Sequence, residues 1–262
     1  MTLKLDILPV DLLDAYQATI DGPKLESSFK CLTEAEISSD TFSFYISVAS
    51  VFSSKIEGEE IELDSYIKFK KYGVKFLPDY INKIDDLYDA YTFAKNNPLN
   101  EKNILKAHKL LSKHLVDKFQ RGEIRSQNMY VINDEGRIEY VAASPYEVKA
   151  EMEKLYADIR QLLDSVINIQ EVFFFAAMIH LVFVKIHPFN DGNGRTARLL
   201  EKWFIAQKLN EKAWFIQSEK NYYLCHQLYY DNLRTLGLEY PELDYRKSLP
   251  FLIMTGKSLI EL

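Results

Sequence analysis

The sequence predicts an all-α fold that carries one small β-hairpin. Apolar residues recur at helical spacing in a series of segments, as Leu87, Tyr91 and Ala94 do in one of them. A strand-like pattern occurs once, at 129–141, where two short runs rich in β-branched and aromatic residues flank a glycine-containing turn. No internal repeat, low-complexity tract or long linker interrupts the 262 residues. No boundary between two independent domains is therefore expected.

The composition is that of an ordinary globular protein, with 47% hydrophobic and 27% charged residues. A formal net charge of −6 argues against a nucleic-acid partner, because such binders are usually basic. Cys31 and Cys225 lie far apart without metal-ligand spacing, so a reduced, cytoplasmic setting is expected. Acidic and proline residues occur early in the chain, so no signal-peptide core is expected at its start. The apolar run from Val172 to Ile186 is about fifteen residues long, which is short for a membrane-spanning helix. We therefore expect a buried helix there and expect no contact with a membrane.

The elements follow in order from local signals. The opening 38 residues are expected to form an arm against the main body, with a short helix before a break at Asp21-Gly22-Pro23. N-cap candidates at Ser38–Thr41 precede a helix from Phe42 to Ile56, which Gly58 ends in a left-handed conformation. The other helices expected from the apolar periodicity lie at 64–72, 78–95, 99–119, 146–167, 172–186, 199–209 and 241–262.

Other aromatic and histidine residues are expected to be structural. Trp203, Phe204, Trp214 and Phe215 are assigned to the core. His108 and His114 are placed within the helix at 99–119, and neither has Cys or carboxylate neighbours at metal-ligand spacing. Structural or surface roles are therefore expected for both histidines.

One polar stretch, from His187 to Arg198, organises the chain. It contains one imidazole, one carboxylate, two glycines flanking an asparagine, and two arginines three residues apart. Gly-Asn-Gly suits a tight turn with positive φ that leaves backbone N–H groups pointing outward. If a helix begins there, these groups and the helix dipole form an anion site, and Arg195 and Arg198 lie on one face to bind phosphate oxygens. The stretch predicts a phosphate cradle with a base and a metal ligand at its rim.

This stretch, His-Pro-Phe-x-Asp-Gly-Asn-Gly-Arg-x-x-Arg, resembles the signature of Fic-domain proteins of the Fido superfamily. Most of these proteins transfer AMP from ATP to a protein hydroxyl. The alternative, a helix–loop–helix turn with incidental charges, is weaker because all nine defined positions of the twelve-residue signature agree. The resemblance spans roughly residues 38–240 and implies a Fic-type helical bundle. It divides the chain into an N-terminal arm at 1–38, an inhibitory-helix region at 39–60, and a Fic core with closing helices at 61–262.

The resemblance implies a role for each residue of the signature. His187 would accept the proton of a Ser, Thr or Tyr hydroxyl, which then attacks the α-phosphorus of ATP. Asp191 resembles the magnesium ligand, a hard oxygen donor that shares the ion with phosphates. ATP and magnesium are therefore the expected substrate and metal. The residues expected to bind the nucleotide here are Asn190, Gly192, Asn193, Gly194, Arg195 and Arg198.

The end of the helix at 42–56 carries a second resemblance. Ser53-Ser54-Lys55-Ile56-Glu57-Gly58 fits the inhibitory motif Ser/Thr-x-x-x-Glu-Gly/Asn of Fic proteins, so Ser53, Glu57 and Gly58 are the expected inhibitory residues. In the family this glutamate reaches the second signature arginine, here Arg198, in space that the ATP γ-phosphate needs. A carboxylate and a phosphate oxygen compete for the same guanidinium. The position of the motif resembles the class with an N-terminal inhibitory helix. The alternative is an ordinary acidic helix terminus.

In Fic proteins a hairpin at the position of 129–141 is the flap that holds the target. The expected docking residues are Met129, Tyr130, Val131 and Ile132, on the first strand. An exposed sheet edge can align an extended segment through main-chain hydrogen bonds. The expected partner is thus a target protein that presents an extended, hydroxyl-bearing segment. The alternative is an ordinary hairpin.

Two tyrosine pairs follow the signature, Tyr222-Tyr223 and Tyr229-Tyr230, on what is expected to be one further helix. In the family, residues on the helix after the signature help to bind adenine. Tyr229 and Tyr230 are accordingly expected at the nucleotide, with a core position as the alternative. The chain has Cys225-His226 where the family often has Asn-Arg. This departure leaves the base contacts and the nucleotide preference open.

The resemblance leaves alternatives in activity. Transfer of the γ-phosphate occurs in relatives with lysine at the position of Gly194, and the glycine argues against it. Phosphocholine transfer, removal of AMP with Glu57 positioning water, and self-modification stay open. A nucleotide-sensing scaffold is the non-enzymatic alternative. The oligomeric state is also open, a homodimer included. The function expected overall is that of a self-inhibited protein adenylyltransferase.

Overall fold

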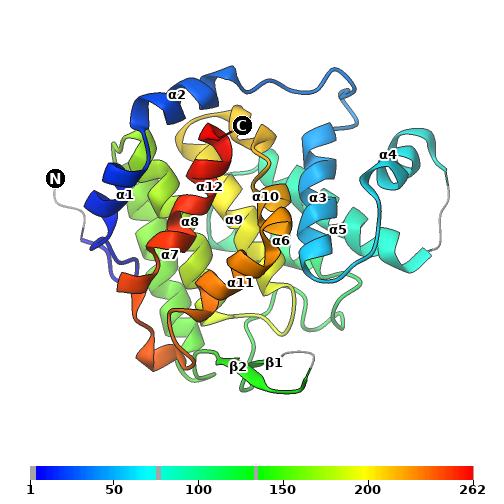
Figure 1. The fold of residues 1–262 in the computed structure, drawn as a ribbon. Helices are drawn as coiled ribbons and strands as arrows, with labels where there is room; N and C mark the ends of the chain where they lie inside the picture. The colour runs from blue at the N-terminus through cyan, green and yellow to red at the C-terminus, as the bar shows by residue number, and fades with distance from the viewer. Residues whose placement is uncertain (1–3, 75–77, 133–134, 262) are drawn as a thin grey trace.

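Two long helices, α8 (Ile169–Ile186) and α9 (Asn193–Lys208), form the centre of the molecule. The other helices surround this pair in the computed structural model, which describes residues 4–74, 78–132 and 135–261 (Figure 1). By length and composition α8 could cross a membrane, but 78% of it is buried inside the protein. A helix covered on all sides is apolar around its whole circumference. The all-α fold predicted from the sequence is confirmed.

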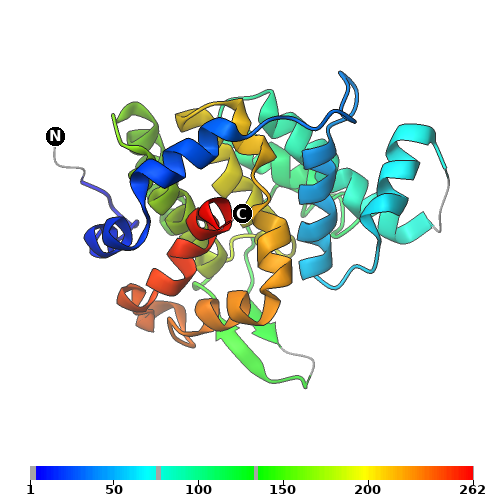
Figure 2. The same ribbon diagram turned by 45° about the horizontal axis from the view of Figure 1, so that its top comes forward.

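The N-terminal segment contains two helices where one was expected. They are α1 (Leu13–Thr19) and α2 (Gly22–Cys31), and both pack on α8 and α12 (Leu249–Ile260) (Figure 2). The predicted break at Asp21-Gly22-Pro23 is also a helix start, because the Asp21 side chain accepts a hydrogen bond from the Lys24 amide and proline fits the first turn. Tyr16 and Leu25 are fully buried, so this segment closes one side of the core.

Helix α3 (Phe44–Ile56) packs against α5 (Pro78–Lys95) and α10 (Ser218–Leu224). Its N-cap is Ser43, whose hydroxyl accepts from the Ile46 amide, and not one of residues 38–41. Gly58 has a φ of 86° just after the helix, as the sequence predicted. Helix α4 (Leu63–Tyr72) lies on the outer side of α3 and α5 (Figure 1).

Helix α6 (Glu101–Leu111) is shorter than predicted. The expected helix at 99–119 gives way at Ser112 to a series of turns that ends at Gly122. Gly122 has a φ of 77°, and a Cβ there would lie 2.7 Å from the Leu105 carbonyl oxygen. Leu115 keeps the apolar spacing but reaches the core from a turn. His114 therefore lies outside the helix in which it was expected.

Strands β1 (Tyr130–Ile132) and β2 (Ile138–Val141) form the antiparallel hairpin predicted at 129–141. Val131 is opposite Tyr140, and a bulge separates Val131 from Ile132. On its outer side β2 meets the chain near residue 239, where the Val141 amide donates to the Leu238 carbonyl. In the described part of the chain β1 pairs with β2 alone, so its outer edge is open. The expected turn at 133–136 lies partly outside the described residues.

The C-terminal third differs from prediction in its boundaries. Helix α7 (Val148–Asp164) is shorter than the expected 146–167. The tyrosine pairs lie on two helices, α10 and α11 (His226–Arg234), because the chain turns at Cys225. The closing segment begins with two short 3₁₀ turns before α12. The predicted core residues Trp203, Phe204, Trp214 and Phe215 are all buried.

Candidate active site

His187 is the C-cap of α8 and has a φ of 55°, in the left-handed region that is uncommon for residues other than glycine. Arg125 stabilises this conformation by donating from Nε to the His187 carbonyl at 2.7 Å. The same guanidinium also binds the carbonyls of Gln127 and Ala143. Arg125 thereby ties the segment before the flap to the residue that carries the imidazole, a role the sequence alone did not suggest.

The imidazole of His187 has the protonation required of a base. Its Nδ1 lies 3.0 Å from the Val184 carbonyl oxygen, an atom that only accepts, so Nδ1 carries the proton and donates. Nε2 is therefore the unprotonated nitrogen. Burial lowers the pKa of His187, which keeps the ring neutral near pH 7.

The loop between α8 and α9 is held by two side chains. Asn193 accepts from the Phe189 amide with Oδ1 and donates to the Phe189 carbonyl with Nδ2, both at 2.8 Å. His108 stacks on the Phe189 ring at 3.6 Å and accepts from the Gly122 amide with Nδ1, so its Nε2 donates to the Asp191 carbonyl. Burial lowers the pKa of His108 to about 4. Both polar atoms of the Asn193 side chain thus bond within the loop. The group of Asn193 that is left to bind a nucleotide, as expected from the sequence, is its backbone amide.

Helix α9 begins where the sequence predicted an anion site. The amides of Asn193, Gly194 and Arg195 form its first turn and have no acceptor within the helix. Gly192 has a φ of 77°, and a Cβ there would lie 2.9 Å from Leu111 Cδ1. A Cβ on Gly194 would lie 2.6 Å from Glu57 Oε1. The Glu57 carboxylate therefore occupies the start of α9, where negative charge is favoured.

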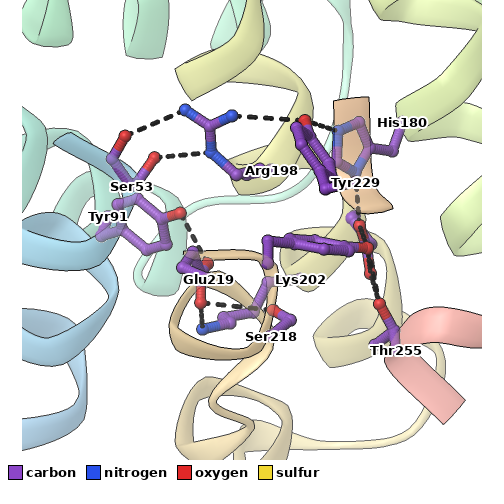
Figure 3. Close-up of polar contacts among 11 residues, drawn as sticks. Ser53, Tyr91, His180, Arg198, Lys202, Ser218, Glu219, Tyr229 and Thr255 are labelled. Carbon is purple, nitrogen blue, oxygen red and sulfur yellow. Dashed lines mark hydrogen bonds and ion pairs between the residues drawn. The ribbon is translucent and has the colours of Figure 1, made fainter. Parts of the chain in front are cut away.

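Arg198 is fully engaged by the end of α3. It donates from Nε to the Ser53 hydroxyl at 2.8 Å, and from Nη2 to the Ser53 carbonyl and to Glu57 Oε1 at 3.0 and 2.6 Å. Nη1 donates to the Tyr229 hydroxyl (Figure 3). Burial alone would raise the pKa of Glu57, but the charges of Arg198 and Arg195 outweigh it and lower that pKa. Glu57 is thus a carboxylate near pH 7.

Arg195 points to a different carboxylate. Its Nη2 lies 3.5 Å from Glu59 Oε1, which also accepts from Lys83 at 2.8 Å. Arg195 is buried, and its Nε has no hydrogen-bond partner among the residues that the structure describes. Glu59, two residues after the predicted inhibitory glutamate, is a part of this arrangement that sequence reasoning missed.

A cavity of about 300 Å³ opens between the start of α9, the end of α8, the hairpin and α11. Eleven of the predicted site residues line it: Glu57, Met129, Tyr130, Val131, His187, Asn190, Asp191, Gly194, Arg198, Tyr229 and Tyr230. Six do not line it: Ser53, Gly58, Ile132, Gly192, Asn193 and Arg195. Six further residues complete the wall, namely Glu139, Tyr140, Val184, Lys185, Leu233 and Arg234. Lys185 had a signal in the sequence, since it is the one charged residue within the apolar run that precedes His187.

The tyrosines divide between the cavity and the core. Tyr229 and Tyr230 line the cavity. Tyr222 is fully buried and donates its hydroxyl proton to Glu201. Behind Arg198, the Tyr229 hydroxyl contacts His180 Nε2 at 3.0 Å, and His180 Nδ1 contacts Glu201 at 2.5 Å (Figure 3). A buried polar chain therefore supports the arginine from the core side.

Asp191 suits a divalent cation that is shared with phosphates. Its side chain is exposed at the cavity rim, and Oδ1 accepts from the Gly192 amide at 2.6 Å, which leaves Oδ2 for a cation. No group of three or more His, Cys, Asp or Glu side chains converges within the described residues. A cation here would take its other ligands from phosphate oxygens and water, as magnesium does.

Comparisons with known proteins agree with this geometry. A model of the Fic/DOC family matches residues 98–205, which contain the loop and most of α9. The part of the chain that carries the loop is therefore similar to the Fic/DOC family. The chain is 35% identical over 150 residues to a protein adenylyltransferase Fic of Aedes aegypti, and 32% identical over 156 residues to one of Culex quinquefasciatus. These matches cover 55% and 58% of the chain but only 25% and 26% of the relatives, so the chain matches about a quarter of their length.

Solved structures share the fold over nearly the whole chain. A Fic family protein from Desulfovibrio desulfuricans G20 has a TM-score of 0.75 at 19% identity, covering 98% of this chain and 74% of its own. A Fic-domain signalling protein from Bacteroides thetaiotaomicron has a TM-score of 0.64 at 19% identity, covering 95% of this chain and 90% of its own. At identities this low, the similarity shows a shared fold and nothing further.

Proposed function

We propose that this chain is a protein adenylyltransferase that transfers AMP from ATP to a Ser, Thr or Tyr hydroxyl of a target protein. The observation that carries the proposal is the placement of His187 Nε2, unprotonated, in one cavity with the start of α9 and Arg198. The names of the relatives from Aedes aegypti and Culex quinquefasciatus support the same activity. The acidic charge of the chain favours a protein target over a nucleic acid. We also propose that it acts in the cytoplasm.

The residues divide the reaction between them. His187 Nε2 takes the proton of the target hydroxyl as the hydroxyl oxygen forms a bond to the α-phosphorus. The bond to the bridging oxygen of the β-phosphate breaks, and pyrophosphate leaves. The amides of Gly194 and Arg195 stabilise charge on the phosphate chain. Magnesium, held by Asp191, would neutralise phosphate charge.

We further propose that Glu57 inhibits the enzyme from within the chain. Its carboxylate occupies the start of α9 and binds Arg198 at 2.6 Å, so it competes with the ATP tail for both. Ser53, about one helical turn earlier, adds two more contacts to the same guanidinium. An activated enzyme must exchange these contacts for phosphate oxygens.

The open edge of β1 supports the hairpin as the docking strand. The far side of β2 is bonded to the chain near residue 238, whereas the edge of β1 has its amides and carbonyls available. A target segment can add to β1 and bring its hydroxyl to the cavity, because Tyr130 and Val131 line the same wall as His187. Main-chain pairing selects extended conformation more than sequence.

The test compares wild type, Glu57→Gly and Glu57→Gly/His187→Ala with α-labelled ATP and magnesium, in the presence of a cell extract as a source of targets. We expect labelled protein, self-modification included, with Glu57→Gly and a strong reduction with wild type. The double variant should bind ATP without labelling. Glu57→Gly/His114→Ala is the matched control, because His114 lies outside the cavity and bonds to Asp86.

Equal labelling by wild type and Glu57→Gly would remove the inhibitory role and leave the transferase. Labelling that persists at the same rate without His187 would remove the assigned base. ATP binding with no labelling in any sample would favour the scaffold function instead.

A further inference from the structure

Lys185 is a buried cation that the proposed reaction does not use. It lies in the last turn of α8, two residues before His187, and its relative exposure is 4%. Its side chain lines the cavity that contains His187 and Arg198. Lysine is rarely buried unless an anion accompanies it. The groups that compensate the charge of this ammonium group must therefore be identified.

The other two cations of the cavity wall are paired and Lys185 is not. Arg198 binds Glu57, and Arg234 binds Glu139, each at 2.6 Å. Lys185 Nζ lies 4.0 Å from the centre of the Tyr140 ring. Among the described residues it has neither a carboxylate within ion-pair distance nor a hydrogen-bond acceptor. The ring covers one side of the ammonium group, and its N–H donors are left for whatever enters the cavity.

The lysine lies on the hairpin side of the cavity. The Tyr140 hydroxyl donates to the Lys185 carbonyl at 2.7 Å, which ties β2 to the end of α8. Val131, on the docking strand, is opposite Tyr140, and both line the cavity. A side chain of a segment added to β1 can therefore enter the cavity whose wall carries the ammonium group.

The phosphate elements lie elsewhere. Glu57 marks the start of α9, and Asp191 marks the cation site; both raise the pKa of His187. Burial lowers the pKa of Lys185 to about 8. The Lys185 ammonium group lies against the Tyr140 ring of β2, whereas Glu57 binds Arg198 at the start of α9.

We propose that Lys185 and Tyr140 form an anion subsite that binds the carboxylate of an Asp or Glu side chain close to the hydroxyl to be modified. The proposal rests on the proposed transferase function and names its substrate class, an acidic segment. A carboxylate entering this subsite compensates the buried charge and receives the unused N–H donors. Main-chain pairing on β1 supplies little sequence selectivity, and Lys185 supplies the selectivity that pairing lacks.

The test measures the titration of Lys185 by NMR in protein with ¹³Cε-labelled lysine. The protein is Glu57→Gly/His187→Ala, so no AMP transfer occurs and the result does not depend on turnover. The Lys185 resonance is identified by its loss in Lys185→Arg. The probes are acetate as the carboxylate, magnesium–ATP as the phosphate, and chloride at matched ionic strength, with the exposed Lys113 as the control lysine.

We expect saturable acetate binding that raises the Lys185 pKa by about one unit or more, with and without magnesium–ATP present. Lys113 should not respond. A response to magnesium–ATP that excludes acetate would make Lys185 part of the phosphate site and overturn the proposal. An equal response to chloride, or no response to any anion, would overturn it as well.

The same design separates this proposal from the transferase. If AMP transfer fails in every labelling experiment but acetate binds at Lys185, the subsite stands and its substrate assignment falls. If transfer succeeds and acetate does not bind, the transferase stands and the subsite falls.

Discussion

Arg198 and Lys185 are buried cations on the same cavity, and they differ in how completely their hydrogen-bond donors are used. Arg198 donates to Ser53, Glu57 and Tyr229 through all three of its nitrogens. Lys185 has one aromatic ring beside it. A saturated cation must give up partners before it binds a ligand, whereas an unsaturated one gains by binding. Arg198 therefore suits a site where ligand binding is regulated, and Lys185 suits a site that selects among ligands.

The largest expected effect comes from removing the saturated cation. Arg198→Met leaves the Glu57 carboxylate and the Ser53 and Tyr229 groups without their partner. Breaking a buried pair in this way costs about 3–5 kcal/mol in the free energy of unfolding. Urea unfolding at pH 7 measures the loss.

The double variant Arg198→Met/Glu57→Ala controls this prediction, since it removes both charges and should recover part of the loss. A single variant as stable as wild type would show that the contacts between α3 and α9 contribute nothing to stability.

Removing Lys185, the unsaturated cation, should change the free energy of unfolding in the opposite direction. The folded pKa of Lys185, about 8, lies below its ordinary value of 10.5, so burial of its charge destabilises the protein at all pH values below about 8. Lys185→Met should therefore raise the free energy of unfolding at pH 7 by about 2–3 kcal/mol. The gain should shrink as the pH rises from 8 towards 10.5, because Lys185 is then neutral in the folded wild type.

Unfolding curves at pH 7 and pH 9.5 measure this gain, with Lys113→Met as an exposed control that should change little. A loss of stability in Lys185→Met at pH 7 would contradict the view that the charge is uncompensated.

Glu57→Gln should sharpen the comparison by loosening Arg198 without changing the shape of the side chain. The amide keeps one acceptor but loses the charge that competes with phosphate. We expect ATP to bind about ten times more tightly, as the loss of one charge-assisted hydrogen bond implies. Calorimetric titration with magnesium–ATP measures the dissociation constant.

The pH dependence of wild type provides the control. The pKa of Glu57 is lowered, so its contribution is complete above the ordinary value of 4.5 and is lost only as the pH falls through the lower folded value. Weak ATP binding should thus persist from pH 6 to 8. A steep gain in affinity within that range would assign the competition to another group.

The smallest effect is expected at the support behind Arg198. Tyr229→Phe removes the hydroxyl that joins Arg198 Nη1 to His180 Nε2. We expect a loss of about 1 kcal/mol in the free energy of unfolding. Tyr230→Phe is the matched control, because its hydroxyl lies 3.5 Å from the Ile56 carbonyl and contributes little. Equal losses in both variants, measured by urea unfolding, would remove the support role.

The signals that predicted correctly act over short stretches of chain. Apolar periodicity located α4, α5 and α8 to within a few residues, because a helix is stabilised by residues three and four apart. Gly58 marked the end of α3, and Gly192 precedes α9, since both need positive φ. The prediction failed for α6, whose last apolar residues pack from turns, and for α2, whose starting Asp-Gly-Pro was taken only as a break.

The sequence by itself determined the helical class, the hairpin, and the chemistry of the stretch from His187 to Arg198, because propensity, turn geometry and residue type are local properties. Only the tertiary structure decided which groups face one another. Ser53 meets Arg198 from 145 positions away, His108 meets Asp191 from 83, and Lys185 meets Tyr140 from 45. Such contacts depend on how the helices pack, and packing also decides which charges are paired and which are left for a ligand.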